Sequence, residues 1–104
     1  MTSNKTEISE VMINGMNKVL SKYGISATPD YLKNMLKGSE LEKFLLSESD
    51  GFDTYEREWF MDEFAVKLTG MEWPTNSDSE QYLEKFQKVF VSKIREEEGI
   101  SILE

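Results

Sequence analysis

The chain has 104 residues and a formal net charge of −8, and it contains neither cysteine nor histidine. This length suits one domain with a modest core, and a hydrophobic content of 38% is too high for a disordered chain. The two missing residue types exclude disulfides and cysteine metal sites, and they remove the commonest general base and transition-metal ligand. We therefore expect one non-catalytic acidic domain over residues 1–104, with no cofactor, no metal ion and no catalytic residue.

Acidic residues are concentrated in the middle of the chain. Residues 38–84 contain thirteen Asp and Glu against three Lys and Arg, whereas residues 1–37 are slightly basic. This distribution argues against direct nucleic-acid binding, because phosphate contacts need clustered Lys and Arg. It fits two alternatives, which are an acidic surface that aids solubility and an acidic patch that attracts a basic partner.

Capping residues, helix-ending glycines and apolar periodicity together predict an all-α fold. We expect a small irregular bundle of four main helices and one short helix, arranged around a central helix at residues 54–69. The other helices are expected at Thr6–Tyr23, Pro29–Lys37, Asp78–Glu98 and, for the short one, Glu40–Leu46. Residues 25–27 are expected to be a connector, and residues 99–104 either dock on the bundle or form a loose tail.

The ends of the predicted helices follow from local sequence. Asp53 and Glu56 form a capping box ahead of the central helix, and Gly70 is placed to end it. Thr28 before Pro29 is a strong helix start, because a hydroxyl cap is followed by proline at the first helical position. Two further capping boxes are expected from Ser39 with Glu42 and from Ser77 with Glu80.

The loop at residues 47–53 carries carboxylates and hydroxyls around Gly51, as a calcium-binding loop does. With Gly51 at the sixth position of such a loop, however, the twelfth position is Arg57 instead of the bidentate Glu. The spacing therefore predicts an acidic turn and no metal site.

The central helix has apolar side chains on two opposite sides. One stripe consists of Phe60, Phe64 and Leu68 with Met61 and Ala65 beside them, and the second of Tyr55, Trp59 and Val66. Such a helix is either enclosed in a bundle or packed on one side and open to a partner on the other. In the first case the second stripe is core beneath the first or last helix.

Six residues of the central helix are candidate partner-binding residues: Tyr55, Glu56, Glu58, Trp59, Asp62 and Glu63. Tyr and Trp bury a large area at a low cost in entropy, so they are typical anchors of interfaces. The carboxylates beside them suit a partner surface rich in Lys and Arg, and they steer its approach.

These features favour a non-catalytic acidic protein that binds and neutralises a basic protein, as an immunity protein, an antitoxin or a nuclease inhibitor does. The expected partner is a nuclease or another protein that handles nucleic acid. The alternative is a structural subunit that self-associates through the second stripe, so a monomer and a homodimer both stay open. Residues 1–20 lack the pattern of a signal peptide and no segment could span a bilayer, so we expect a cytoplasmic protein without membrane contact.

Overall fold

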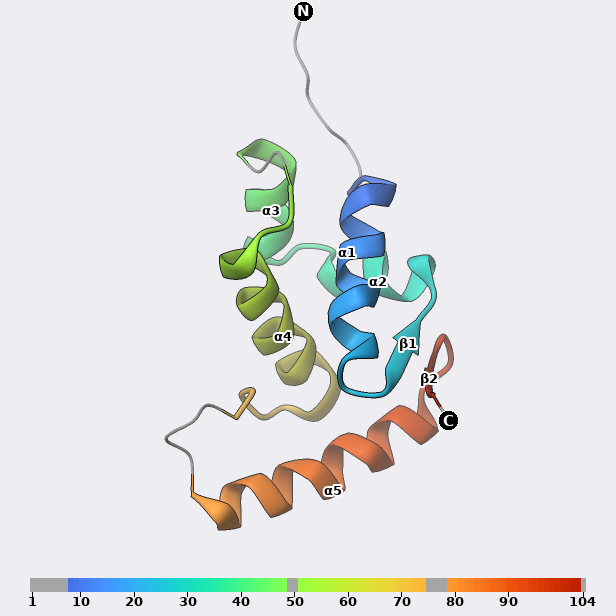
Figure 1. The fold of residues 1–104 in the computed structure, drawn as a ribbon, viewed down its shortest axis with the longest axis vertical. Coiled ribbons are helices and arrows are strands. Elements are labelled where there is room, and N and C mark those ends of the chain that lie inside the picture. Colours follow the sequence, from blue (N-terminus) through green and yellow to red (C-terminus); the bar gives the residue numbers. More distant parts are fainter. Residues whose placement is uncertain (1–7, 49–50, 75–78, 104) are drawn as a thin grey trace, which may run out of the picture.

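The computed structural model describes residues 8–48, 51–74 and 79–103 (Figure 1). This part of the chain is mostly helical, which confirms the predicted all-α helical domain, and it adds one small antiparallel sheet. The elements are α1 (Glu10–Ser21), β1 (Ile25–Ala27), α2 (Pro29–Leu36), α3 (Glu40–Ser47), α4 (Thr54–Thr69), α5 (Glu80–Glu96) and β2 (Ile100–Ile102).

Side-chain caps fix where the helices begin. Asp53 and Glu56 form the predicted capping box of α4, and Gly70 ends the helix in the left-handed conformation at φ 76°. Thr28 caps α2, because its hydroxyl accepts a hydrogen bond from the backbone N–H of Tyr31 at 3.1 Å. The helices therefore begin where short-range hydrogen bonds satisfy their first N–H groups.

Two predicted helix starts fall partly outside the described residues. Thr6 is not among them, and α1 begins at Glu10 with Ser9 as its cap. The predicted cap Ser77 is also outside them, and α5 begins at Glu80 because the Ser79 hydroxyl accepts from the backbone N–H of Tyr82 at 3.2 Å.

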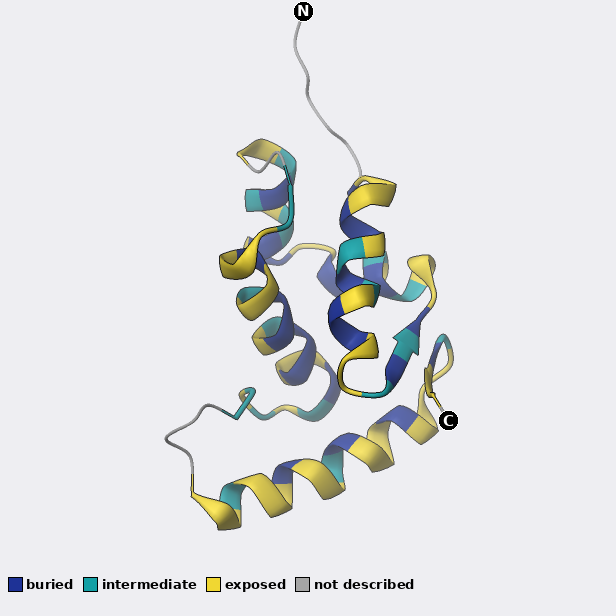
Figure 2. Ribbon diagram, in the orientation of Figure 1, coloured by how far each residue is buried: buried dark blue, intermediate teal, exposed yellow. Residues whose placement is uncertain are grey.

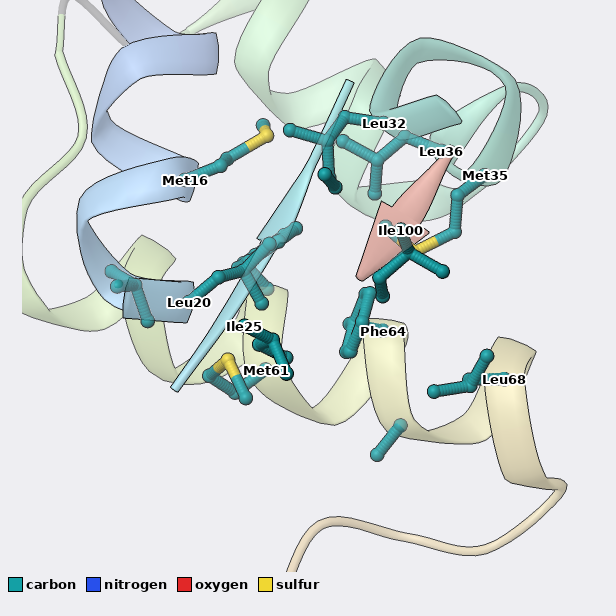
Figure 3. Close-up of a cluster of buried hydrophobic side chains, with 14 of the residues drawn as sticks. Met16, Leu20, Ile25, Leu32, Met35, Leu36, Met61, Phe64, Leu68 and Ile100 are labelled. Atoms are coloured by element: carbon teal, nitrogen blue, oxygen red, sulfur yellow. The ribbon is translucent and has the colours of Figure 1, made fainter. Parts of the chain in front are cut away.

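Helix α4 is the centre of the core and contacts α1, α2, α3 and α5. Figure 1 shows α4 beside α1, with α3 at its N-terminal end and α5 crossing below its C-terminal end. Its predicted core stripe is confirmed, since Phe60, Phe64 and Ala65 are fully buried. Figure 2 shows the buried residues of each helix turned inward, and Figure 3 shows Phe64 among side chains from α1, α2 and both strands.

The expectation of a connector at residues 25–27 is wrong, and of the two alternatives for residues 99–104 the structure shows docking, through Ile100–Ile102. The two segments pair as antiparallel strands, with Ile25 opposite Ile102 and Ala27 opposite Ile100. Burial alternates along β1, where Ile25 and Ala27 are buried and Ser26 is not, whereas on β2 only Ile100 is buried and Ser101 and Ile102 are exposed. The hydroxyls of Ser26 and Ser101 lie 3.3 Å apart on the outer side. Segments of three residues are too short for this alternation to be recognised in the sequence.

An asparagine of α1 closes the outer edge of β1. The Asn17 amide accepts a hydrogen bond from the N–H of Ala27 and donates one to its carbonyl oxygen, both at 3.0 Å. A single side chain therefore supplies the two bonds that a further strand would make there. The ribbon is thus tied to α1 as well as to the end of α5.

Candidate partner-binding surface

The second apolar stripe of α4 faces away from the core. Tyr55 is 62% exposed and Val66 is 41% exposed, so neither lies as core beneath α1 or α5. Trp59 is half-buried because it leans on the neighbouring helix α3. Helix α4 is therefore packed on one side and open on the other.

Three aromatic rings form a continuous cluster on this open side. The ring centroids of Phe44 and Trp59 are 5.5 Å apart, those of Tyr55 and Trp59 are 5.7 Å apart, and those of Phe44 and Tyr55 are 6.4 Å apart. These separations are typical of tilted and edge-to-face aromatic contacts. We call Phe44, Tyr55 and Trp59 the aromatic triad. Because α3 supplies Phe44, the triad spans two helices and is held in one arrangement by their packing.

Carboxylates surround the aromatic triad. Those that neighbour the triad on α3 and α4 are Glu40, Glu48, Glu58, Asp62 and Glu63, which we call the acidic rim. Glu40 and Glu48 lie one helical turn to either side of Phe44, and the other three flank Tyr55 and Trp59 on α4. All are exposed except Glu63, which is half-buried. The rim places negative charge around an apolar centre.

Lys43 on α3 already forms an ion pair with Glu40 of the rim. Lys43 lies 3.6 Å from Glu40, and both side chains are well exposed. An exposed pair of this kind contributes little to stability and exchanges easily for another partner. The rim therefore keeps most of its charge available.

Glu56 does not belong to this surface, which corrects the prediction from the sequence. It is 5% exposed, and its Oε1 accepts a hydrogen bond from the backbone N–H of Asp53 at 3.3 Å. The capping box turns its side chain back towards the start of α4, and its position on the helix lies about 100° from Tyr55, towards the core stripe. Glu56 therefore supports the helix end and cannot meet a partner.

Asp62 is exposed as predicted, and it also holds the segment that follows α4. Its Oδ1 accepts a hydrogen bond from the backbone N–H of Trp73 at 3.2 Å. Trp73 lies in the segment after α4 and packs edge-on against Tyr23, Phe86 and Phe90. Asp62 therefore positions the chain between α4 and α5 although the residue is exposed.

A groove of about 640 Å³ lies beside the acidic rim. Tyr23 and Trp73 form aromatic walls, and the lining includes Lys22 and Arg57 as well as Glu58 of the rim. Charges of both signs occur within the groove, so it favours neither an anion nor a cation. It extends the surface around the triad without defining a ligand.

The pKa of Asp53, the N-cap of α4, is lowered by its hydrogen bonds. Hydrogen bonds from Glu56, first from its side chain and then from its backbone N–H, hold the pKa of Asp53 below its ordinary value of 3.8. The unfolded chain therefore takes up a proton at higher pH than the folded protein. The stability that Asp53 supplies is present above the unfolded pKa and is lost as pH falls through the lower folded pKa.

We expect wild type to lose more stability between about pH 5 and about pH 2 than Asp53→Asn, in urea unfolding at each pH. Asparagine keeps an acceptor for the helix cap but does not titrate in this range. Equal losses in the two proteins would show that Asp53 makes no contribution to acid sensitivity.

Comparison of the chain with protein-family models, with curated proteins and with solved structures found no significant match in any of the three. Across the described ranges, carboxylates nowhere gather in a group of three that could hold a metal ion. Asp50 belongs to the loop that was compared with a calcium-binding loop, and it lies outside the described residues. None of the helices described is long and apolar enough to cross a membrane.

Proposed function

We propose that this protein is a non-catalytic binding protein whose aromatic triad and acidic rim dock on a basic protein, in the manner of an immunity protein, an antitoxin or a nuclease inhibitor. The observation that carries the proposal is the aromatic cluster on α3 and α4, in which Tyr55 is exposed and Phe44 and Trp59 are half-buried, with five carboxylates on the same two helices and their ends. The proposal includes a partner that handles nucleic acid, such as a nuclease, and the cytoplasm as the place of action.

The triad has the physical properties of an interface centre. Tyr and Trp supply most of the binding energy in many interfaces, because they bury a large area with few rotatable bonds. Ring contacts across two packed helices hold the triad before a partner arrives, so little side-chain entropy remains to be lost on binding. This arrangement favours a rigid docking surface over an adaptable one.

The acidic rim determines which partner is favoured. Carboxylates around an apolar centre attract a surface rich in Lys and Arg and repel an acidic one, so they contribute specificity and a fast approach. The same negative charge disfavours direct contact with nucleic-acid phosphates. A protein that itself binds nucleic acid offers the basic surface that the rim needs.

The test begins with capture of binding proteins by immobilised wild type, by Tyr55→Ala with Glu58→Lys, and by Val11→Ala. Val11 is 71% exposed on α1 and serves as a control for losing an exposed apolar side chain elsewhere. Mass spectrometry should identify a basic protein that wild type and Val11→Ala retain and the double variant loses. Retention of that protein by wild type and by both variants would show that the triad is not in the interface.

Kinetics with the captured partner test the role of the rim. The association rate should fall steeply with rising salt, since steering charges act over a Debye length of about 10 Å at 0.1 M. Trp59→Ala should mainly speed dissociation, because interface anchors act on the bound state. A partner that is itself acidic, or an association rate that is flat with salt, would contradict the proposal.

In the alternative function the same surface binds a second copy of this protein instead of a basic partner. Tyr55 and Val66 are exposed apolar side chains on one helix face, and such a face also suits a structural subunit that self-associates symmetrically. That contact would bring two acidic rims together, and their repulsion is why we favour the basic partner.

A further inference from the structure

The middle of the outer face of α5 carries exposed cations, and the exposed carboxylates Glu84 and Glu96 border them on the same helix. Between Lys85 and Arg95 the chain has four cations and no carboxylate, although Glu84 and Glu96 adjoin this stretch. Lys85, Lys88 and Arg95 are exposed, on the side opposite to the buried residues Phe86, Phe90 and Ile94. Val91 lies among them and is 38% exposed. We call Lys85, Lys88, Val91 and Arg95 the basic strip.

The basic strip lies far from the aromatic triad of its own molecule and faces away from the core. Helix α5 packs on α4 through Phe90, whose ring lies 6.0 Å from that of Phe64. The triad lies towards the other end of α4 and on α3, and Figure 1 shows α3 and α5 at opposite ends of α4. Figure 2 shows α5 as a helix whose outward residues are exposed along its length. The strip is therefore free to meet another molecule.

We propose that the basic strip of one copy docks on the aromatic triad and acidic rim of a second copy. This inference rests on one part of the proposed function, namely that the triad and the rim form a docking surface. It does not depend on a foreign partner. Charge complementarity supports it, because the strip and the rim are matched opposite charges within one sequence. In this contact Val91 covers the triad, and the Lys and Arg side chains reach the carboxylates around it.

Helix geometry makes the two surfaces similar in length. Lys88 and Arg95 are seven residues apart on α5, which corresponds to about 10 Å along a helix. Glu40 is the first residue of α3 and Glu48 is its C-cap, eight residues on, which corresponds to about 12 Å along the helix. One helix of the second copy can therefore place its two cations near the two ends of the rim, and an Arg beside Trp59 gains a cation–π contact.

The contact is head to tail, which has two consequences. Each added copy leaves one strip and one rim unused, so assembly continues to a ring or an open chain. A foreign basic partner competes with α5 for the same triad, so binding of that partner releases the copies from one another. Self-association thus covers the aromatic triad while the partner is absent.

The test uses two full-length variants that each lose one surface. Lys88→Glu with Arg95→Glu reverses the strip, and Glu48→Lys with Glu58→Lys reverses two exposed positions of the rim. Light scattering of wild type should show a mass that rises with concentration above the monomer value of 12.1 kDa. Each double variant alone should stay at the monomer mass, because like charges then face each other.

Mixing the two double variants distinguishes this contact from a symmetric one. One variant keeps an intact rim and the other keeps an intact strip, so the mixture should form complexes of at least twice the monomer mass. Lys18→Glu with Lys37→Glu makes the same change in net charge at exposed positions away from α5 and should assemble like wild type. Circular dichroism checks that each variant is folded, and Lys88→Gln with Arg95→Gln replaces the reversed strip if that variant is not.

Wild type that stays at 12.1 kDa at all concentrations would overturn the inference, as would a mixture that stays monomeric. If wild type is monomeric and still captures a basic partner through Tyr55, the inference fails and the proposed function stands. If wild type assembles but its captured partner ignores the triad and rim, the proposed function fails and the inference stands.

Discussion

Replacing Phe64 by alanine should lower the free energy of unfolding by about 3–5 kcal/mol. Phe64 is fully buried, and its ring lies 6.4 Å from that of Tyr31 on α2, 5.8 Å from Phe60 on α4 and 6.0 Å from Phe90 on α5. Truncation removes one ring from the meeting point of three helices and leaves a cavity that a packed core fills only in part. Urea unfolding followed by circular dichroism measures the loss.

Trp59→Ala is the matched control for this prediction. Trp59 is also a large aromatic residue of α4, directly before Phe60 of the core stripe, but it is half-buried against Phe44. We expect a loss of about 1–2 kcal/mol, because part of the ring keeps its contact with water in the folded protein. Equal losses for Trp59→Ala and Phe64→Ala would assign Trp59 to the core and leave the proposed surface with little beyond its charge.

Glu56→Lys should destabilise the fold by about 3 kcal/mol. The change removes the carboxylate that accepts from the N–H of Asp53, and it introduces a cation at a position that is 5% exposed. A positive charge in the first turn of α4 also opposes the helix dipole. Denaturant unfolding and the helical circular dichroism signal both report this loss.

Two companion variants separate charge from capping. Glu56→Gln keeps a side-chain oxygen in the capping box and should cost about 1 kcal/mol or less. Glu63→Lys reverses the same charge at a half-buried position seven residues along α4 and should cost about 0.5 kcal/mol. If Glu56→Lys cost as little as Glu63→Lys, Glu56 would be on the surface after all and would again be a candidate partner-binding residue.

The helices and the core stripe of α4 could be predicted because the interactions that define them are local. Asp53 bonds to N–H groups two and three residues away, and Gly70 ends α4 through its own backbone conformation. The same local rule shows why the prediction for Glu56 was wrong. A residue of a capping box must turn back towards the helix start, so membership of the box already excluded it from an outward surface.

The rest of the candidate site depends on packing between elements. Phe44 joins the triad because α3 lies beside the N-terminal half of α4, and a helical pattern within α3 does not reveal that neighbour. The ribbon is a stronger case, since Ile25 and Ile102 each complete the other's structure. Periodicity within a segment contains no information about which distant segment covers it.

The two-stranded ribbon has a consequence for how the chain folds. Ser26 and Ser101 are 75 positions apart, and closing a chain loop of that length costs on the order of 4 kcal/mol in entropy. Three residue pairs, with about 1 kcal/mol net for each hydrogen bond, do not offset this cost without help. The helices must therefore bring β1 and β2 together, and the ribbon in turn holds the end of α5 against the first third of the chain. Such mutual dependence favours all-or-none folding, in which neither end of the protein keeps its structure once the other has lost it.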